Sequence, residues 1–220
     1  MSVTVYQLEH SPYCIPVTRA LEALGVPFQT RNVANGNRAE IITLTGGAHY
    51  QVPVLAHGDN VIFESSPIST DIAHYVDRTF AEGRLFPAEH EGFQRIVIGH
   101  IENDIEGVTF KLIDPFYVAS ISDPIERTMV IRHKERKFGV GCEEAWAAGQ
   151  DELLQAAGIL LKPYDITLAQ RAFLFGDAPL YADFALYGVL GNMTYKGHVS
   201  IPTSLPALIE WFGRMKTFRF

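Results

Sequence analysis

The chain has 220 residues, of which 47% are hydrophobic, so it can bury a sizeable core in one large domain or two small ones. Its net charge of −7 argues against nucleic acid or an anionic membrane as the main partner, because no large basic surface is available. The apolar runs are far shorter than the roughly 20 residues of a membrane span, and the start lacks a basic signal segment, so we expect a cytoplasmic protein. The two cysteines match no disulfide framework and no zinc spacing, so we expect reduced thiols and no bound metal.

The first residues predict a parallel strand-helix-strand unit. Aliphatic and aromatic residues over 3–8 indicate a buried strand, and apolar residues at helical spacing over 17–24 indicate a helix face. After a break at Gly25, the segment 28–33 alternates with period two, as a half-buried strand does. The three elements together have the length of a minimal parallel crossover unit.

Further short elements follow this unit. We expect a short helix over 38–44 and two antiparallel strands over 52–56 and 61–63, joined by a turn. The segment 64–67 predicts the cap of a further helix, with Ile68 on its apolar face. The predicted order is therefore β-α-β-α-β-β-α.

The rest of the chain is helical in pattern. Helices are expected roughly over 91–114, 123–157, 163–172, 179–195 and 204–217. The change of pattern predicts an α/β domain over 1–80, a linker over 81–92 and an all-α domain over 93–220.

The junction between the first strand and the first helix reads Ser11-Pro12-Tyr13-Cys14. Ser11 is a good N-cap, and Pro12 is favoured at the first helical position. The free N–H groups of a helix start stabilise an anion such as a thiolate. On these residues alone an ordinary helix cap remains the alternative to a reactive site.

Three motifs and the order of elements resemble the cytosolic glutathione transferase superfamily. Ser11-Pro12-Tyr13-Cys14 stands at the place of the thioredoxin-fold C-x-x-C, with serine first as in serine-type members. Gln51-Val52-Pro53-Val54-Leu55 resembles the segment in which a cis proline begins the third strand, and Phe63-Glu64-Ser65 resembles the segment that receives the γ-glutamyl end. The stretch 175–183 resembles the family's buried helix start, so the likeness spans essentially the whole chain.

The resemblance implies a thioredoxin-like glutathione-binding domain, followed by a helical domain that contributes the electrophile pocket. It also implies a homodimer that uses glutathione as co-substrate in detoxification. The Ser11 hydroxyl would donate a hydrogen bond to the glutathione sulfur, and the thiolate would attack a small hydrophobic electrophile.

Cys14 is the competing candidate for contact with the sulfur, although a buried packing thiol is the expectation for this position. A reactive Cys14 would instead support a thiol-transferase or a lyase, including ether-cleaving or dehalogenating chemistry. Tyr6 is a further candidate, with packing in mid-strand as its expected role. A non-enzymatic binding module remains a third alternative, because fold does not establish chemistry.

The implied glutathione-binding residues lie on the second and third motifs or in the segment before them. They are Gln51, Val52, Pro53, Glu64, Ser65, Arg38 and His49. Val52 would pair with the cysteinyl backbone, while Ser65 and Glu64 would take the γ-glutamyl carboxylate and ammonium. Arg38 and His49 are the candidates for the glycine carboxylate, because no lysine is obvious in the loop over 43–50.

The electrophile pocket is expected to include Tyr13, Phe110, Phe116 and Tyr117, although aromatic residues at helical spacing are more often core. The basic run over 127–137 is expected to be a solvated helix face, with steering of the anionic tripeptide as a minor role. His100, Glu102 and Asp104 are likewise expected on an exposed helix surface.

The helix start near residue 180 departs from the family pattern. Leu180 stands where the family usually has Ser or Thr, so a reciprocal capping box cannot form. Asp183 can still accept hydrogen bonds from backbone N–H groups.

Overall fold

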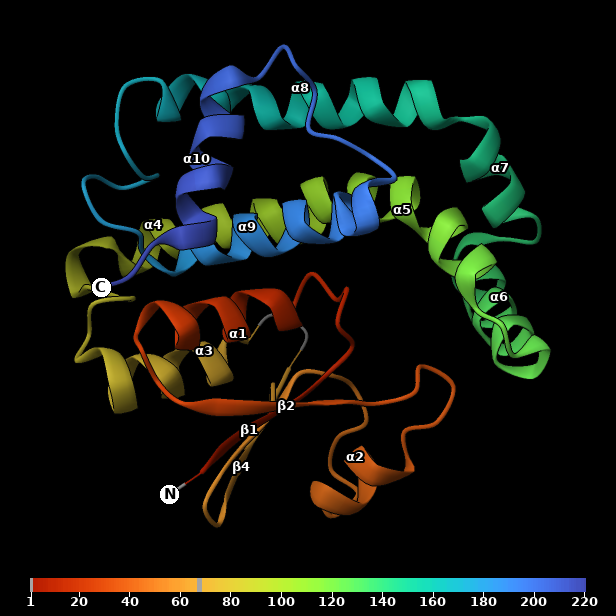
Figure 1. Ribbon diagram of the computed structural model, residues 1–220, viewed down its shortest axis with the longest axis horizontal. Coiled ribbons are helices and arrows are strands. Elements are labelled where there is room, and N and C mark those ends of the chain that lie inside the picture. The colour runs from red at the N-terminus through yellow and green to blue at the C-terminus, as the bar shows by residue number, and fades with distance from the viewer. Residues whose placement is uncertain (1, 67–68) are drawn as a thin grey trace.

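A computed structural model describes residues 2–66 and 69–220 of the chain. A four-stranded sheet lies below a layer of long helices (Figure 1). The strands are β1 (Val3–Gln7), β2 (Phe28–Asn32), β3 (Val54–His57) and β4 (Asn60–Ile62). Their order is β2-β1-β3-β4, with β1 and β2 parallel and the other neighbours antiparallel. This mixed sheet confirms the thioredoxin-like fold expected for the first domain.

The two faces of the sheet are covered by different helices. Helices α1 (Cys14–Ala23) and α3 (Asp71–Val76) lie on the face toward the helical layer, and α2 (Ala39–Leu44) lies on the other face (Figure 1). Successive strand residues point to opposite faces. Accordingly, Val5 belongs to the large core with α1, while Tyr6 packs on the smaller core beside α2.

The helical layer begins with a nearly continuous rod. Helix α4 (Ala88–His100) passes through the π-helical turn η2 (Ile101–Ile105) into α5 (Glu106–Ser120). Another π-helical turn, η1 (Asp77–Ala81), precedes the helical layer. The remaining helices are α6 (Pro124–Phe138), α7 (Cys142–Ala148), α8 (Gln150–Leu168), α9 (Tyr181–Met193), the 3-10 turn η3 (Tyr195–Gly197) and α10 (Pro206–Thr217).

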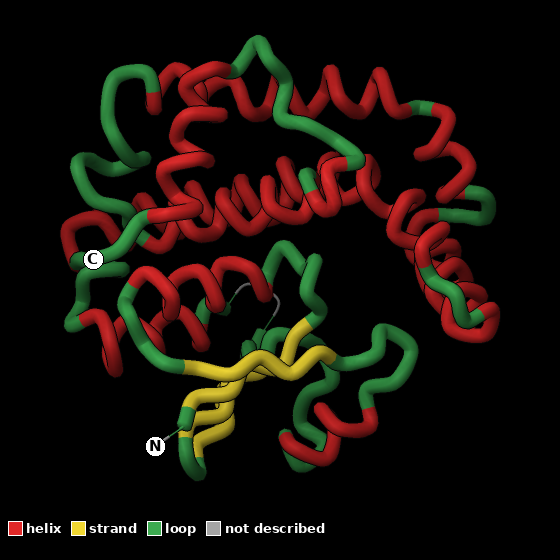
Figure 2. Tube along the Cα trace, viewed as in Figure 1, coloured by secondary structure: helices red, strands yellow, loops and turns green. Residues whose placement is uncertain are grey.

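Helix α9 lies at the centre of the molecule, between the first domain and the outer helices (Figure 2). It packs against α1, α5 and α10, and most of its side chains are buried. A helix that is apolar around its circumference is expected in such a position. One continuous core therefore joins the sheet to the helical layer, from Val5 through Leu186 to Trp211.

Several helix limits differ from the sequence-based expectation. The helix expected over 123–157 is interrupted near Gly139 and Gly141, which adopt φ values of 100° and 79° that are costly for other residues. The helices expected to stop near Pro115 and to begin near Pro163 instead continue through these prolines. Tertiary packing outweighs the lost hydrogen bond at both sites.

The start of α3 also differs from the expectation. The helix begins at Asp71 and has Thr70 at its N-cap, so the segment 64–67 is not its first turn. The Glu64 side chain nevertheless reaches this helix start and accepts hydrogen bonds from it. The expected positions of Pro67 in the cap and Ile68 on the helix face lie outside the described residues.

Asp183 connects α9 to the surrounding chain. Its fully buried carboxylate accepts hydrogen bonds from the N–H groups of Leu174 and Leu180, at 3.0 and 3.1 Å, and from Trp211 Nε1 at 3.0 Å. The Asp183 carboxylate thus accepts hydrogen bonds from backbone N–H groups, as expected. The Leu180 side chain has no acceptor atom, so the reciprocal side-chain hydrogen bond of a capping box does not form.

The two regions of the chain are also joined by polar contacts and one very close approach. Asn192 Nδ2 on α9 donates to the His10 carbonyl at 2.7 Å. Gly188, on the same helix, lies directly against Pro12 and Pro16. Arg19 on α1 donates from Nε to the Met215 carbonyl at 2.7 Å and from Nη2 to the Phe218 carbonyl. The loop over 8–13, the candidate reactive loop, is therefore supported by the helical layer.

No helix within the described residues has the length and apolar character needed to cross a bilayer.

Candidate active site

A cleft of about 1030 Å³ lies between loops of the first domain and the helical layer. The wall from the first domain carries Tyr13, Pro16, Val17, His49, Gln51, Val52, Pro53, Glu64, Ser66, Ser69 and Thr70. The opposite wall is formed by parts of α4, η2, α5 and α6, together with Tyr181 at the start of α9. The cleft thus brings together most of the predicted glutathione-binding residues.

The turn before α1 places its side chains differently from the expectation. Helix α1 begins at Cys14 with Tyr13 at its N-cap, so Ser11 is not the cap of the assigned helix. Ser11 closes the preceding turn instead: its Oγ accepts from the Tyr13 N–H at 3.3 Å, and its carbonyl accepts from the Ile15 N–H at 3.1 Å. Tyr13 is 39% exposed and lines the cleft, whereas Ser11 is 7% exposed and does not.

Cys14 lies behind this turn and is fully buried. Burial raises the pKa of its thiol to about 11, and this effect outweighs the opposing influence of a hydrogen bond with the Ser11 side chain. The thiol is therefore protonated near neutral pH. Its environment is that of a packing residue and not of a reactive cysteine.

The second motif presents free backbone groups at the cleft. The Val52–Pro53 peptide bond is cis, as predicted. Within the described residues Val52 makes no backbone hydrogen bond, since β3 pairs with β1 only from Val54 onward. Its N–H and C=O are available to an extended ligand. Gln51 and His49 lie beside it on the same wall, and partial burial lowers the pKa of His49.

The third motif forms a compact polar network around the start of α3. The Glu64 carboxylate accepts from Ser69 Oγ at 2.8 Å, from the Asp71 N–H at 2.7 Å and from the Ile72 N–H at 3.3 Å. In return, the Ser65 N–H donates to Asp71 Oδ2 at 2.7 Å. Glu64 lines the cleft, while Ser65 is exposed beside it and is not among the lining residues.

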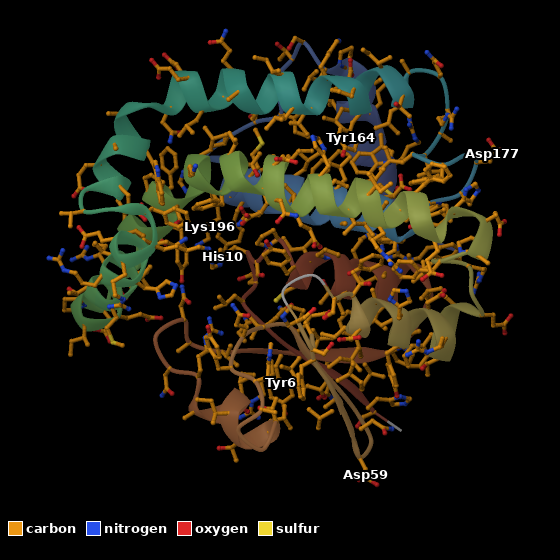
Figure 3. All side chains as sticks on the ribbon, turned by 180° about the vertical axis from the view of Figure 1, so that it is seen from behind. Tyr6, His10, Asp59, Tyr164, Asp177 and Lys196 are labelled. Atoms are coloured by element: carbon orange, nitrogen blue, oxygen red, sulfur yellow. The ribbon has the colours of Figure 1, made fainter. Side chains whose placement is uncertain are left out.

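Arg38 and Tyr117 lie outside the cleft, where the first domain meets α5. Arg38 Nη2 donates to Asn35 Oδ1 at 2.9 Å, and Asn35 Nδ2 donates to the Tyr117 hydroxyl at 3.2 Å. The Tyr117 ring also packs on His10, which occupies the same junction (Figure 3). These side chains connect the two regions of the chain.

Two other aromatic candidates also lie away from the cleft. Phe116 stacks on His198, with 4.8 Å between ring centroids. Tyr6 lies on the opposite face of the sheet from the helical layer (Figure 3). Of the four aromatic residues predicted for the electrophile pocket, only Tyr13 and Phe110 line the cleft.

The helical wall contains functional groups that sequence reasoning missed. Glu102 was expected on an exposed surface, yet it lines the cleft together with Glu106. Ile101 and Ile105 are fully buried in the core. The residues that directly follow them, Glu102 and Glu106, therefore place their carboxylates on the side of the cleft. Burial raises the pKa of each of these two carboxyls to about 7. The sequence contained a signal for this arrangement, because Glu102 and Glu106 are four residues apart and each follows one of two apolar residues with the same spacing.

Basic side chains on α6 also line the cleft, and His133 and Lys137 are exposed there, as expected of a solvated helix face. His133, Lys134 and Lys137 belong to this wall, and Lys134 forms an ion pair with the buried Asp114. The wall is therefore more polar than a pocket for purely hydrophobic electrophiles would be.

Within residues 2–66 and 69–220, no group of three or more His, Cys, Asp or Glu side chains is placed to hold a metal ion.

A thioredoxin-like domain with a cis proline at the mouth of a cleft, closed on its other side by a helical layer, defines a protein with the glutathione transferase fold. Residues 5–84 match the family model described as "Glutathione S-transferase, N-terminal domain". This match, together with the relatives below, confirms the resemblance to the cytosolic glutathione transferase superfamily.

Named relatives extend the likeness over nearly the full chain. A rice (Oryza sativa subsp. japonica) protein, "Probable glutathione S-transferase GSTU6", is 23% identical over 94% of this chain and 80% of its own length. The solved glutathione transferase GSTFuA3 from Phanerochaete chrysosporium has a TM-score of 0.80 at 17% identity, with 100% of this chain and 98% of that chain covered. Glutaredoxin 2 from Salmonella typhimurium, solved in complex with glutathione, has a TM-score of 0.72 at 22% identity, with 98% and 95% covered. At these identities the structural likeness establishes the fold.

Proposed function

We propose that this protein is a glutathione transferase that binds glutathione in the cleft and joins its sulfur to an electrophilic carbon. The observation that carries the proposal is the free backbone of Val52 beside the cis proline. An extended tripeptide can pair with this N–H and C=O as an added strand. The family match over 5–84 and the solved glutathione complex of a structural relative support the same ligand.

Activation of the sulfur is assigned to the turn before α1. Ser11 Oγ accepts the Tyr13 N–H, and its hydroxyl hydrogen would turn from the Cys14 side chain to the thiolate of the ligand. A charge-assisted hydrogen bond of about 1.5–3 kcal/mol and a helix-end contribution of about 0.3–1 kcal/mol together lower a thiol pKa by about one to three units. Tyr13 is the alternative donor, because its phenol lines the cleft whereas Ser11 lies behind it.

The two ends of the tripeptide are assigned to opposite sides of Val52. Glu64 would take the γ-glutamyl ammonium while its carboxylate continues to cap α3, and Ser65 would take the adjacent carboxylate. His49 is favoured over Arg38 for the glycine carboxylate, because His49 lines the cleft and Arg38 is held by Asn35 outside it.

The assembly that we propose has a glutathione-binding domain over 1–80, a linker over 81–92 and a helical domain over 93–220. We also propose that two copies associate through α4, whose Phe93 and Ile96 side chains are 67% and 70% exposed. Two large apolar side chains one turn apart suit a protein contact.

A thiol-transferase that uses Cys14 is the rival function, and the structural likeness to a glutaredoxin is the reason to consider it. The full burial of this thiol and its raised pKa disfavour it. Mass spectrometry after treatment with oxidised glutathione separates the two functions: a glutathionylated Cys14 would support the rival, and an inert Cys14 would support the transferase.

Isothermal calorimetry with glutathione tests the proposed function directly. We expect a measurable heat at millimolar ligand, and conjugation of an electrophile such as 1-chloro-2,4-dinitrobenzene. If no binding of glutathione is detected at this concentration, the result would instead favour a non-enzymatic binding module.

A further inference from the structure

Three lysines gather over two aromatic rings on the helical wall of the cleft. Lys134 Nζ lies 4.8 Å and Lys111 Nζ lies 5.7 Å from the centroid of the Phe110 ring. Lys137 Nζ lies 5.1 Å from the centroid of the Phe138 ring, which packs on Phe110 with 5.3 Å between centroids. All five residues belong to the cleft wall, and we call this group the lysine subsite.

The aromatic floor of the lysine subsite is held from behind by α7. The Trp146 ring makes edge contacts with the rings of Phe110 and Phe138, with 5.3 Å between centroids in each pair. Trp146 itself is buried and does not line the cleft. Because the Phe138 ring is 38% exposed, the floor offers a fixed apolar surface that a planar ligand can cover.

Within the described residues, two of the three ammonium groups have no ionic partner. Lys134 forms an ion pair with Asp114. No described carboxylate lies within ion-pair distance of Lys111 or Lys137. These two cations differ from the rest of the chain, whose net charge is −7. An ammonium group that contacts a ring still has N–H donors for an anionic ligand.

Glu106 links the lysine subsite to the turn before α1. Burial raises the pKa of the Glu106 carboxyl to about 7, and all three lysines oppose this rise, so they lie around one acidic side chain. Burial, followed by the Glu106 charge, raises the pKa of the Tyr13 hydroxyl on the opposite wall. Tyr13 belongs to the turn to which activation of the sulfur is assigned. A molecule bound on the lysine subsite can therefore present its reacting carbon toward that turn.

We propose that the lysine subsite binds a carboxylate on the second substrate, so that the protein conjugates glutathione to aromatic electrophiles that carry an acidic group. The substrate ring covers Phe110 and Phe138, and its carboxylate accepts hydrogen bonds from Lys111 and Lys137. This inference rests on the proposed glutathione chemistry and gives that chemistry a substrate class.

The reaction of a chloroarene balances without a further reagent. With 4-chloro-3,5-dinitrobenzoate, a lone pair of the glutathione thiolate forms the carbon–sulfur bond. The carbon–chlorine bond then breaks, and its electron pair leaves with chloride. The products are a thioether and chloride, and the carboxylate makes and breaks no bond. The lysines therefore contribute to binding of the ground state and the transition state alike, and their removal is expected to change KM and not kcat.

Two electrophiles that differ in one group test this assignment. In 4-chloro-3,5-dinitrobenzamide a neutral amide replaces the carboxylate of 4-chloro-3,5-dinitrobenzoate. For the unsubstituted protein we expect a KM for the benzoate at least about fivefold below that for the benzamide. In the double variant Lys111→Gln and Lys137→Gln, the benzoate KM should rise by about 10-fold, because each exposed ion pair contributes a factor of up to about five. The benzamide KM and both kcat values should stay within about twofold.

Arg136→Gln is the matched control for Lys137→Gln. Each variant removes one positive charge from α6, but Arg136 is exposed and does not line the cleft. The benzoate KM should rise by about threefold or more in Lys137→Gln and by less than about 1.5-fold in Arg136→Gln. Equal increases would overturn the lysine subsite, because they would indicate the overall field of the helix.

The pH dependence adds a readout that a structural role would not change. Glu106 is neutral below about pH 7, and above that pH its negative charge opposes a bound carboxylate. The ratio of the benzoate KM to the benzamide KM should therefore rise as the pH increases through about 7, and the rise should shrink in Glu106→Gln. The ratio removes the ionisation of glutathione, which both substrates share. A ratio that does not change with pH would contradict the proposed position of the carboxylate.

Other charged groups around Glu106 are accounted for in this prediction. Burial lowers the pKa of His133, so this cleft residue stays neutral from pH 6.5 upward. Glu102 also has a pKa of about 7, which is why the rise shrinks and does not vanish in Glu106→Gln. The remaining groups that face Glu106 are Lys111, Lys134, Lys137, Asp114 and Tyr13.

Calorimetry separates this inference from the function on which it rests. The probe 3,5-dinitrobenzoate has no leaving chloride, and we expect it to bind at least about fivefold more tightly than 3,5-dinitrobenzamide. If the protein conjugates 1-chloro-2,4-dinitrobenzene but shows no preference for the benzoate, the lysine subsite is overturned and the transferase stands. A preference that survives in the double variant would also overturn the subsite. If dinitrobenzoate binds but glutathione neither binds nor reacts, the proposed function fails and the anion-binding site stands.

Discussion

Gly188 offers the sharpest test of how the helical layer positions the reactive loop. A Cβ atom added at this position would lie 2.4 Å from the Pro12 carbonyl oxygen and 2.5 Å from ring atoms of Pro16. Ordinary contact begins at 3.4 Å, so the gap to the Pro12 oxygen must widen by about 1 Å. Backbone and proline-ring atoms cannot move aside by changing rotamer. In Gly188→Ala, α9 or the loop carrying Ser11 and Tyr13 must therefore shift.

The size of the effect follows from two opposing contributions. Overpacking of a core typically costs about 1–3 kcal/mol, while replacing glycine by alanine inside a helix returns about 1 kcal/mol. The net loss for Gly188→Ala is up to about 2 kcal/mol, which lowers Tm by about 4–8 °C for a chain of this size. A shift of about 1 Å in the reactive loop is expected to lower kcat/KM for conjugation by about 100-fold.

Gly191→Ala provides the control, because it lies one turn further along the same helix. Its added Cβ would meet only the Ile15 side chain, at 3.2 and 3.4 Å, and that side chain can adjust. We expect scanning calorimetry to give a Tm equal to or above that of the unsubstituted protein, and conjugation within about threefold. If Gly188→Ala matched Gly191→Ala in both Tm and kcat/KM, the proposed support of the loop by α9 would be refuted.

Three further predictions address the sulfur contact, the pH dependence and the assembly. Ser11→Ala should lower kcat for conjugation by about 10-fold or more with little change in glutathione affinity, because a charge-assisted hydrogen bond contributes about 1.5–3 kcal/mol. If the kinetics of Ser11→Ala were unchanged and Tyr13→Phe lost activity instead, the role would belong to Tyr13. Burial lowers the pKa of His10 to about 4, so its contribution to stability is complete above about pH 6.5 and is lost as the pH falls toward 4. In His10→Phe, the decrease in Tm between pH 7.5 and pH 5 should therefore shrink, and an unchanged decrease would rule out His10 as its source. Ile96→Glu should convert a dimer to monomers, as measured by light scattering. Ile159→Glu on α8 replaces a side chain of similar exposure and should leave the dimer intact. The same result for both variants would contradict the α4 contact.

The elements that the sequence predicted well are those specified by local pattern. Alternation over 28–33 and the apolar run at 3–8 identified neighbouring parallel strands, and the cis bond at Val52–Pro53 followed from the motif around it. The buried acceptor role of Asp183 was also within reach, because a carboxylate near a helix start has few other uses.

The differences arise where a distant part of the chain decides the outcome. Ser11 carried every local feature of a helix cap, yet the assigned helix begins later, and α9 lies against the same loop. Glu102 had the pattern of a solvated residue, yet it lies on a cleft wall that faces residues of the first domain, and burial there raises the pKa of its carboxyl. A single sequence states which helix face is polar. It does not state what lies opposite that face.

The contacts of Arg19 bear on how this protein folds while it is being synthesised. Its buried guanidinium donates to the carbonyls of Met215 and Phe218, which follow it by nearly two hundred residues. At about 5–20 residues per second, a ribosome needs about 10–40 seconds to add that length of chain. During this interval α1 carries a charged group without its native acceptors, on a face that belongs inside the protein. We therefore expect the first domain to acquire its final stability only after the last helix has emerged, although its sheet and its cis proline are encoded near the start.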